Sequence, residues 1–90
     1  MSTSQVIENV IARVTEEKTT LDENATRLDA LLNRFREDSN AANEMGVSVL
    51  EQDLLYRQLR TQRELSAVLG QRLDLLKGKL QKAIKDESEG

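Results

Sequence analysis

The chain has no cysteine, histidine, proline or tryptophan, and only one tyrosine and one phenylalanine among 90 residues. The lack of cysteine excludes disulfides, and the lack of both cysteine and histidine excludes the commonest zinc sites. Because proline is absent, no helix in this chain is interrupted by a proline. A chain this small without such staples buries little apolar surface, so we expect oligomerisation or a partner to add stability.

Residue patterns that carry catalysis or bind cofactors are also missing. No nucleophile–base pair can be built with histidine or cysteine. Carboxylates are numerous, but neighbours such as Glu16 and Glu17 point about 100° apart on a helix. The chain has neither a glycine-rich phosphate loop nor the spacing of an EF-hand. We therefore expect a non-enzymatic protein with no catalytic residues, no cofactor and no metal site.

Long apolar runs are lacking too. No stretch approaches the roughly 20 apolar residues that span a membrane, and none follows a basic N-terminus as in a secretory signal peptide. We expect a soluble, cytoplasmic protein without membrane contact. Arg57, Arg60, Arg63 and Arg72 form the best basic run, but the net charge is −3 and only Tyr56 lies nearby for stacking. These arginines favour a solvated face, so we predict no nucleic-acid partner.

What the sequence does contain is apolar residues at helical spacing. Positions three and four apart share one face of an α-helix, whereas a strand would require alternation. Two such stripes occur, one in each half of the chain. They predict the following hairpin core: Ile7, Val10, Val14, Leu21, Leu28, Leu31, Phe35, Leu55, Leu59, Leu69, Leu73, Leu76 and Leu80.

The two stripes match each other in reverse. When the chain is folded about residues 45–46, Val14 meets Leu76 and Leu31 meets Leu59, and the two numbers of each pair add to 90. One polar layer follows the same rule, because Asn24 meets Ser66. A uniform register of this kind predicts an all-α, antiparallel, coiled-coil-like helical hairpin.

Start and stop signals divide a single domain, residues 1–90, into helix 1 (about 4–36), a turn region (about 37–48), helix 2 (about 49–85) and a frayed acidic tail (86–90). Ser2 with Gln5 and Ser48 with Glu51 fit capping boxes at the two helix starts. Gly46 can adopt the left-handed conformation that ends a helix. Whether residues 37–45 form helix or loop stays open.

The charges of the two halves have opposite signs. Residues 1–46 hold five basic and nine acidic side chains, whereas residues 47–85 hold eight basic and four acidic ones. The last five residues add three acidic side chains. Each exposed ion pair contributes only about 0.2–1 kcal/mol, so we expect charge to select the pairing of the helices rather than to hold it.

Helix 2 carries more apolar residues than one partner helix covers. A second stripe at helical spacing predicts a partner interface: Leu50, Leu54, Leu65, Val68 and Leu75. Helix 1 has a smaller surplus set of Ile11, Ala25 and Leu32. A contiguous apolar patch of several hundred Å² usually marks an interface. The alternative is that these residues pack within one wide hairpin seam.

The pattern favours a protein–protein interaction module that self-associates into a dimer or four-helix bundle. The alternative is a small chaperone or adaptor that covers the apolar helix of one heterologous partner. In size, acidity and lack of cysteine the chain resembles the small co-chaperones of type III secretion needle subunits, which implies the alternative. The turn Glu44-Met45-Gly46 is similar to that of small secreted hairpins with a Trp-x-Gly turn, but Glu44 replaces the tryptophan.

Overall fold

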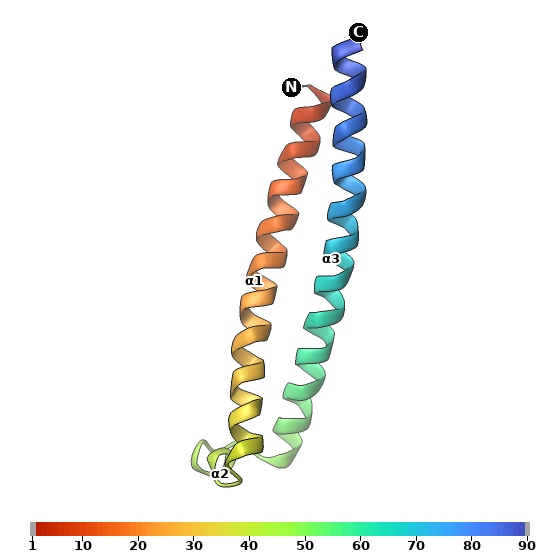
Figure 1. The fold of residues 1–90 in the computed structure, drawn as a ribbon. Coiled ribbons are helices and arrows are strands. Elements are labelled where there is room, and N and C mark those ends of the chain that lie inside the picture. The colour runs from red at the N-terminus through yellow and green to blue at the C-terminus, as the bar shows by residue number, and fades with distance from the viewer. Residues whose placement is uncertain (1, 90) are drawn as a thin grey trace.

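The computed structural model describes residues 2–89 as two long antiparallel helices joined by a short helical turn. Helix α1 comprises Thr3–Glu37, α2 comprises Ala41–Glu44 and α3 comprises Val49–Glu89. Both chain ends lie at one end of the rod and α2 lies at the other (Figure 1). The molecule measures 66 × 18 × 16 Å. The predicted all-α antiparallel hairpin is confirmed, because α1 packs along α3.

Side-chain caps define where both long helices begin. The Ser2 hydroxyl accepts a hydrogen bond from the Gln5 amide at 3.2 Å, and the Gln5 side chain accepts one from the Ser2 amide at 3.2 Å. At the start of α3, the Ser48 hydroxyl accepts from the Glu51 amide at 3.1 Å. Each contact satisfies an amide that the helix leaves without a partner. The capping box predicted at Ser2 is therefore confirmed, and at Ser48 the structure shows one of the two hydrogen bonds of the predicted box.

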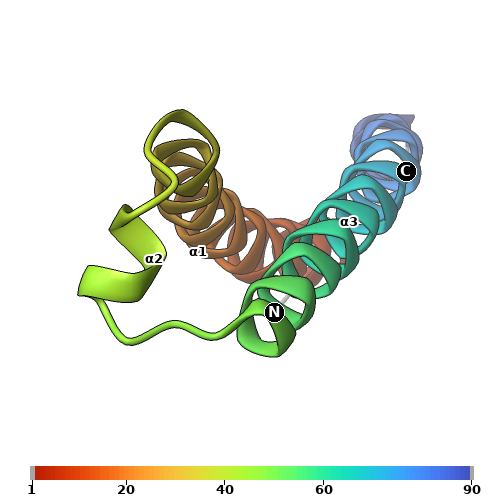
Figure 2. The same ribbon diagram turned by 90° about the horizontal axis from the view of Figure 1, so that it is seen from below.

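The turn region contains one extra helical turn. α1 ends at Glu37, and α2 lies beside its end when the molecule is viewed along the rod (Figure 2). Ala41 and Ala42 are only 1% and 5% exposed, so α2 caps the apolar core at this end. Gly46 has a φ of 71°, a conformation that costs other residues free energy. The predicted left-handed glycine is confirmed.

The C-terminal end of α3 differs from the prediction of a helix that ends near residue 85 with a frayed tail. The helix continues to Glu89, and Gly90 lies outside the described residues. The Glu87 carboxylate accepts hydrogen bonds from the Ser4 amide at 3.1 Å and from the Ser4 hydroxyl at 2.8 Å. A carboxylate complements the positive end of the α1 dipole, which explains why this acidic segment stays helical.

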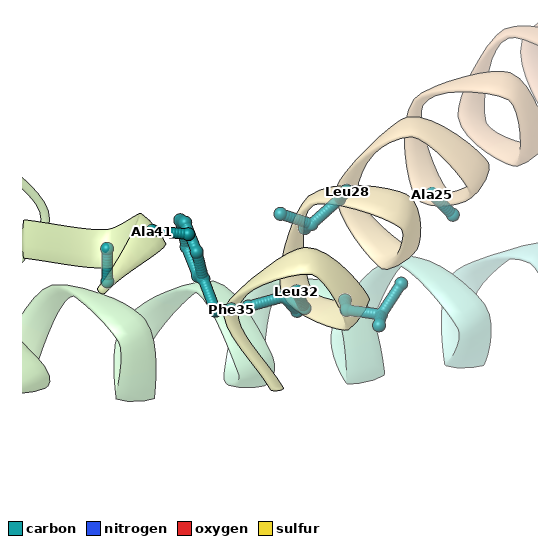
Figure 3. Close-up of a cluster of buried hydrophobic side chains, with 7 residues drawn as sticks. Ala25, Leu28, Leu32, Phe35 and Ala41 are labelled. Carbon is teal, nitrogen blue, oxygen red and sulfur yellow. The ribbon is translucent and has the colours of Figure 1, made fainter. Parts of the chain in front are cut away.

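The buried side chains form two clusters along the seam. The cluster at the turn end contains Ala25, Leu28, Leu32, Phe35, Ala41, Ala42 and Leu59 (Figure 3). The other cluster contains Val14, Leu69 and Leu73. Leu32 is fully buried, and Figure 3 shows the Phe35 ring against Ala41. The core is therefore largest where α2 closes the hairpin.

Every predicted core residue is at least half-buried, but two buried residues were assigned elsewhere. The predicted core residues in the two buried clusters are Val14, Leu28, Phe35, Leu59, Leu69 and Leu73, and the half-buried ones are Ile7, Val10, Leu21, Leu31, Leu55, Leu76 and Leu80. Placing Ala25 and Leu32 in a surplus set was wrong, since their exposed fractions are 7% and 0%. They lie one helical turn after Leu21 and Leu28, so the buried face of α1 is wider than one stripe. Ile11, from the same set, is half-buried against the second cluster.

The predicted register agrees with polar contacts across the seam. Asp29 pairs with Arg63, and Ser4 with Glu87, and in both pairs the residue numbers add to within two of 90. The predicted contact between Asn24 and Ser66 is wrong in detail. The Ser66 hydroxyl donates to Asp22 instead, since a carboxylate is the stronger acceptor.

Candidate functional site

The exposed apolar residues of α3 form the most unusual surface of the hairpin. The five predicted interface residues form the outward stripe, and their exposed fractions are 78% (Leu50), 60% (Leu54), 44% (Leu65), 50% (Val68) and 71% (Leu75). On the inward side of the same helix, Leu59 and Leu69 are only 5% and 2% exposed. α3 thus has two apolar faces, and α1 covers only one of them.

Basic side chains interrupt the outward stripe. Helical spacing places Arg57 and Arg72 in line with the leucines, and both are exposed. The Arg57 guanidinium lies 3.3 Å from the Asp53 carboxylate one turn earlier. Arg72 makes no ion pair with any residue that the structure describes. The stripe therefore combines apolar contact area with at least one cation, Arg72, that forms no ion pair within the described residues.

α1 borders the stripe with a polar surface on which two acidic side chains outnumber one basic side chain. Leu65 lines a hollow of about 450 Å³ together with residues of α1, which are Arg13, Glu16, Glu17, Thr20, Leu21 and Asn24. The outward stripe thus lies beside the carboxylates of Glu16 and Glu17. This two-helix surface, apolar and basic on α3 and acidic on α1, is called the open face below.

A different hollow lies where Tyr56 meets α1. It has a volume of about 630 Å³ and is lined by Asp29, Asn33, Arg36, Tyr56, Leu59, Arg60, Arg63, Glu64 and Ala67. We call it the tyrosine groove. The Arg36 guanidinium lies 5.6 Å from the centroid of the Tyr56 ring, and Asp29 lies 3.3 Å from Arg63 and 3.9 Å from Arg36. Three arginines thus line the hollow that contains the Tyr56 ring; Arg36 lies over the ring, and Arg36 and Arg63 both contact Asp29.

Sequence reasoning missed this grouping. It placed Arg60 and Arg63 on a solvated face and did not connect them with α1. The hairpin register contained the signal, because Arg36 and Tyr56 have numbers that add to nearly 90 and thus lie at one level. Applying the register to polar residues, and not only to leucines, would have found the groove.

The seam contains an ion pair with a hydrogen-bonded carboxylate, Asp22, and one buried amide oxygen without a partner, that of Gln62. The Lys18 ammonium lies 2.8 Å from the Asp22 carboxylate, which also accepts from Ser66. The hydrogen bonds from Lys18 and Ser66 lower the pKa of Asp22, so this carboxylate stays ionised as the pH falls toward its usual range. By contrast, the amide oxygen of Gln62 is buried without a hydrogen-bond partner.

Metal sites and membrane-spanning helices are absent from the described part of the chain. Residues 2–89 contain no cluster of three acidic side chains that could hold a metal ion. Within the same range, none of the helices has the length and apolar character needed to cross a membrane. The open face and the tyrosine groove are the surfaces where apolar, aromatic and charged side chains of both long helices come together.

Comparison with models of known protein families gives a match to the family described as Sequestin, over residues 8–75. The match covers most of α1, the turn and α3 to Leu75, so it includes the outward stripe and the tyrosine groove. No curated protein and no solved structure matches the chain.

Proposed function

The chain belongs to the Sequestin family, and on that premise we propose that it is a non-enzymatic binding protein that works as a self-associated helical bundle. The family name indicates a binding, sequestering role. The observation that supports self-association is the outward stripe, in which five leucine and valine side chains are 44–78% exposed. A second copy of the chain would cover them and turn two hairpins into a four-helix bundle.

The free energy available from this surface is large for so small a protein. A patch of several hundred Å² is at the upper end of what monomers expose. At about 25 cal/mol per Å², covering it contributes roughly 5–10 kcal/mol before the entropy cost of association. That is comparable with the whole stability of a small domain. Self-association through the open face therefore offers the stability that a lone hairpin lacks.

Sedimentation equilibrium of the purified chain and of a Leu65→Ser/Val68→Ser variant tests self-association. We expect the unaltered chain to sediment as a dimer or a larger assembly, with a melting temperature that rises with protein concentration. The double variant should sediment as a monomer and lose that concentration dependence. Ile84→Ser is the matched control, because Ile84 is 48% exposed but lies on the other side of α3.

A monomeric unaltered chain, with melting independent of concentration, would contradict self-association. The apolar stripe would then be left for the heterologous helix of the chaperone alternative. Equal dissociation of the control and of the double variant would also contradict the proposal, because it would show that the stripe is not the interface.

The tyrosine groove favours a second function, the capture of a small anionic molecule that contains a planar ring. Arg36, Arg60 and Arg63 line, together with Tyr56, a hollow of about 630 Å³. Guanidinium groups bind phosphate or carboxylate through paired hydrogen bonds, and tyrosine stacks on planar rings. The two acidic side chains of the groove, Asp29 and Glu64, are outnumbered by these arginines. Such a ligand would be held without being transformed, as the family name implies.

Calorimetric titration with adenosine diphosphate and, separately, with inorganic pyrophosphate tests this second function. We expect adenosine diphosphate to bind more tightly than pyrophosphate, because only the former offers a ring to Tyr56. Arg60→Ala/Arg63→Ala should abolish the heat of binding, whereas Lys77→Ala/Lys85→Ala, which removes the same charge outside the groove, should not. Equal loss in both variants would reduce the effect to overall charge and contradict a site in the groove.

A further inference from the structure

The orientation of the second copy can be inferred from the charges of the open face. We propose that two hairpins pack with their turns at the same end, so that α3 of each lies against α1 of the other. This inference rests on the proposed self-association and specifies its geometry. The two copies would be related by a twofold axis along the rod, and α1 and α3 would alternate around the bundle.

The first argument is the charge of the helices. α1 holds seven acidic and five basic side chains, a net charge of −2, whereas α3 holds seven acidic and eight basic ones, a net charge of +1. The excess of base on α3 lies before residue 86, because Asp86, Glu87 and Glu89 follow it. In the proposed arrangement every helix has two neighbours of the opposite net charge. Complementary potentials across an interface select orientation and suppress wrong pairings.

The second argument is the height along the rod at which individual charged residues of the two copies would face each other. A twofold axis along the rod keeps heights unchanged, so α3 of one copy faces α1 of the other in the register seen within the hairpin. Arg72, which forms no ion pair within the described hairpin, would lie at the level of Glu17 of the second copy. Glu64 would lie at the level of Arg27 of the second copy. The symmetry makes each of these pairs twice.

The opposite arrangement, with turns at opposite ends, lays the outward stripe against itself. The register that matches Leu54 with Leu75 of the other copy also places Arg57 opposite Arg72, again twice. Shifting the register by about one turn in either direction places Leu54 opposite Arg72 or Lys79. Each of these three alignments, which overlap the stripes over most of their length, therefore brings cations together or brings a cation onto a leucine.

A distance between two labels decides between the arrangements. The chain has no cysteine, so Ser39→Cys in the exposed turn accepts a single spin label per copy. With turns at the same end, electron–electron resonance should give a distance on the order of 20–40 Å, a few helix diameters. With turns at opposite ends, the labels should be separated by most of the 66 Å length, which would overturn the inference.

Arg72→Glu gives an independent readout with opposite signs. In the proposed arrangement it places like charges at Glu17 of the second copy, and the dimer should weaken by about tenfold. In the opposite arrangement the substitution replaces the repulsion between Arg72 and Arg57 of the other copy by an attraction, and the dimer should strengthen. Lys77→Glu is the control, because it makes the same charge change on another side of α3. A monomeric unaltered chain would refute the proposed self-association itself, whereas a dimer with distant labels would refute only this geometry.

Discussion

Leu32→Ala is expected to lower the free energy of unfolding by about 3 kcal/mol, within the range of buried leucine truncations. Leu32 is the fully buried side chain of the larger core cluster, and α1, α2 and α3 all contribute to that cluster. Its removal loses apolar burial and leaves a cavity that two rigid helices fill poorly. Urea unfolding followed by circular dichroism measures the loss.

The comparison is best made in a chain that already carries Leu65→Ser and Val68→Ser, so that association does not contribute to stability. In that background Leu50→Ala is the matched control, because Leu50 is 78% exposed, and its effect should stay below about 0.5 kcal/mol. Equal effects of the two truncations would show that the turn-end cluster is not the core. If Leu32→Ala prevents folding, Leu32→Val should still give a loss of about 1 kcal/mol.

Gln62→Leu is expected to raise the free energy of unfolding by about 2 kcal/mol, a large gain for one substitution. The Gln62 amide oxygen is buried in the seam without a hydrogen-bond partner. An unsatisfied buried polar atom costs about 1–3 kcal/mol, and leucine of similar size removes that cost and adds apolar burial. Thermal and urea unfolding of the variant should both show the increase.

Gln81→Leu is the control for this prediction, since Gln81 is an exposed glutamine of the same helix. Its replacement should change the stability by less than about 0.5 kcal/mol. A loss of stability in Gln62→Leu would mean that the amide makes a contact in solution that outweighs its burial. The spin-label distance in the same variant would show whether Gln62 also fixes the geometry of the pair.

The hairpin could be predicted because its two apolar stripes share one register over their whole length. That register follows from helical periodicity alone, so Val14, Leu28, Leu59, Leu69 and Leu73 were all placed in the core. The caps at Ser2 and Ser48 and the left-handed Gly46 were predictable for a similar reason, because each depends on a few neighbouring residues.

The missed features depend on contacts that no single helix specifies. Leu32 is buried because α1, α2 and α3 meet around it, and the sequence did not reveal that α2 forms. Ser66 contacts Asp22 rather than Asn24 because a carboxylate is the stronger acceptor, and the Asn24 amide oxygen already accepts from Arg27. Glu87 extends α3 because it reaches the start of α1, which lies 83 positions away in the chain. The tyrosine groove likewise combines residues from both helices.

The placement of the larger core cluster beside α2 also bears on how the chain folds. Phe35 and Leu59 are separated by a short segment, whereas Ser4 and Glu87 enclose nearly the whole chain. Closing a short loop costs less conformational entropy than closing a long one. The turn end of the hairpin therefore combines the lowest entropy cost of loop closure with the larger cluster of buried apolar side chains. We therefore expect folding to begin at the turn, and the pairing of α1 with α3 to extend from there toward the chain ends. The contact between Ser4 and Glu87 is expected to form last and to break first.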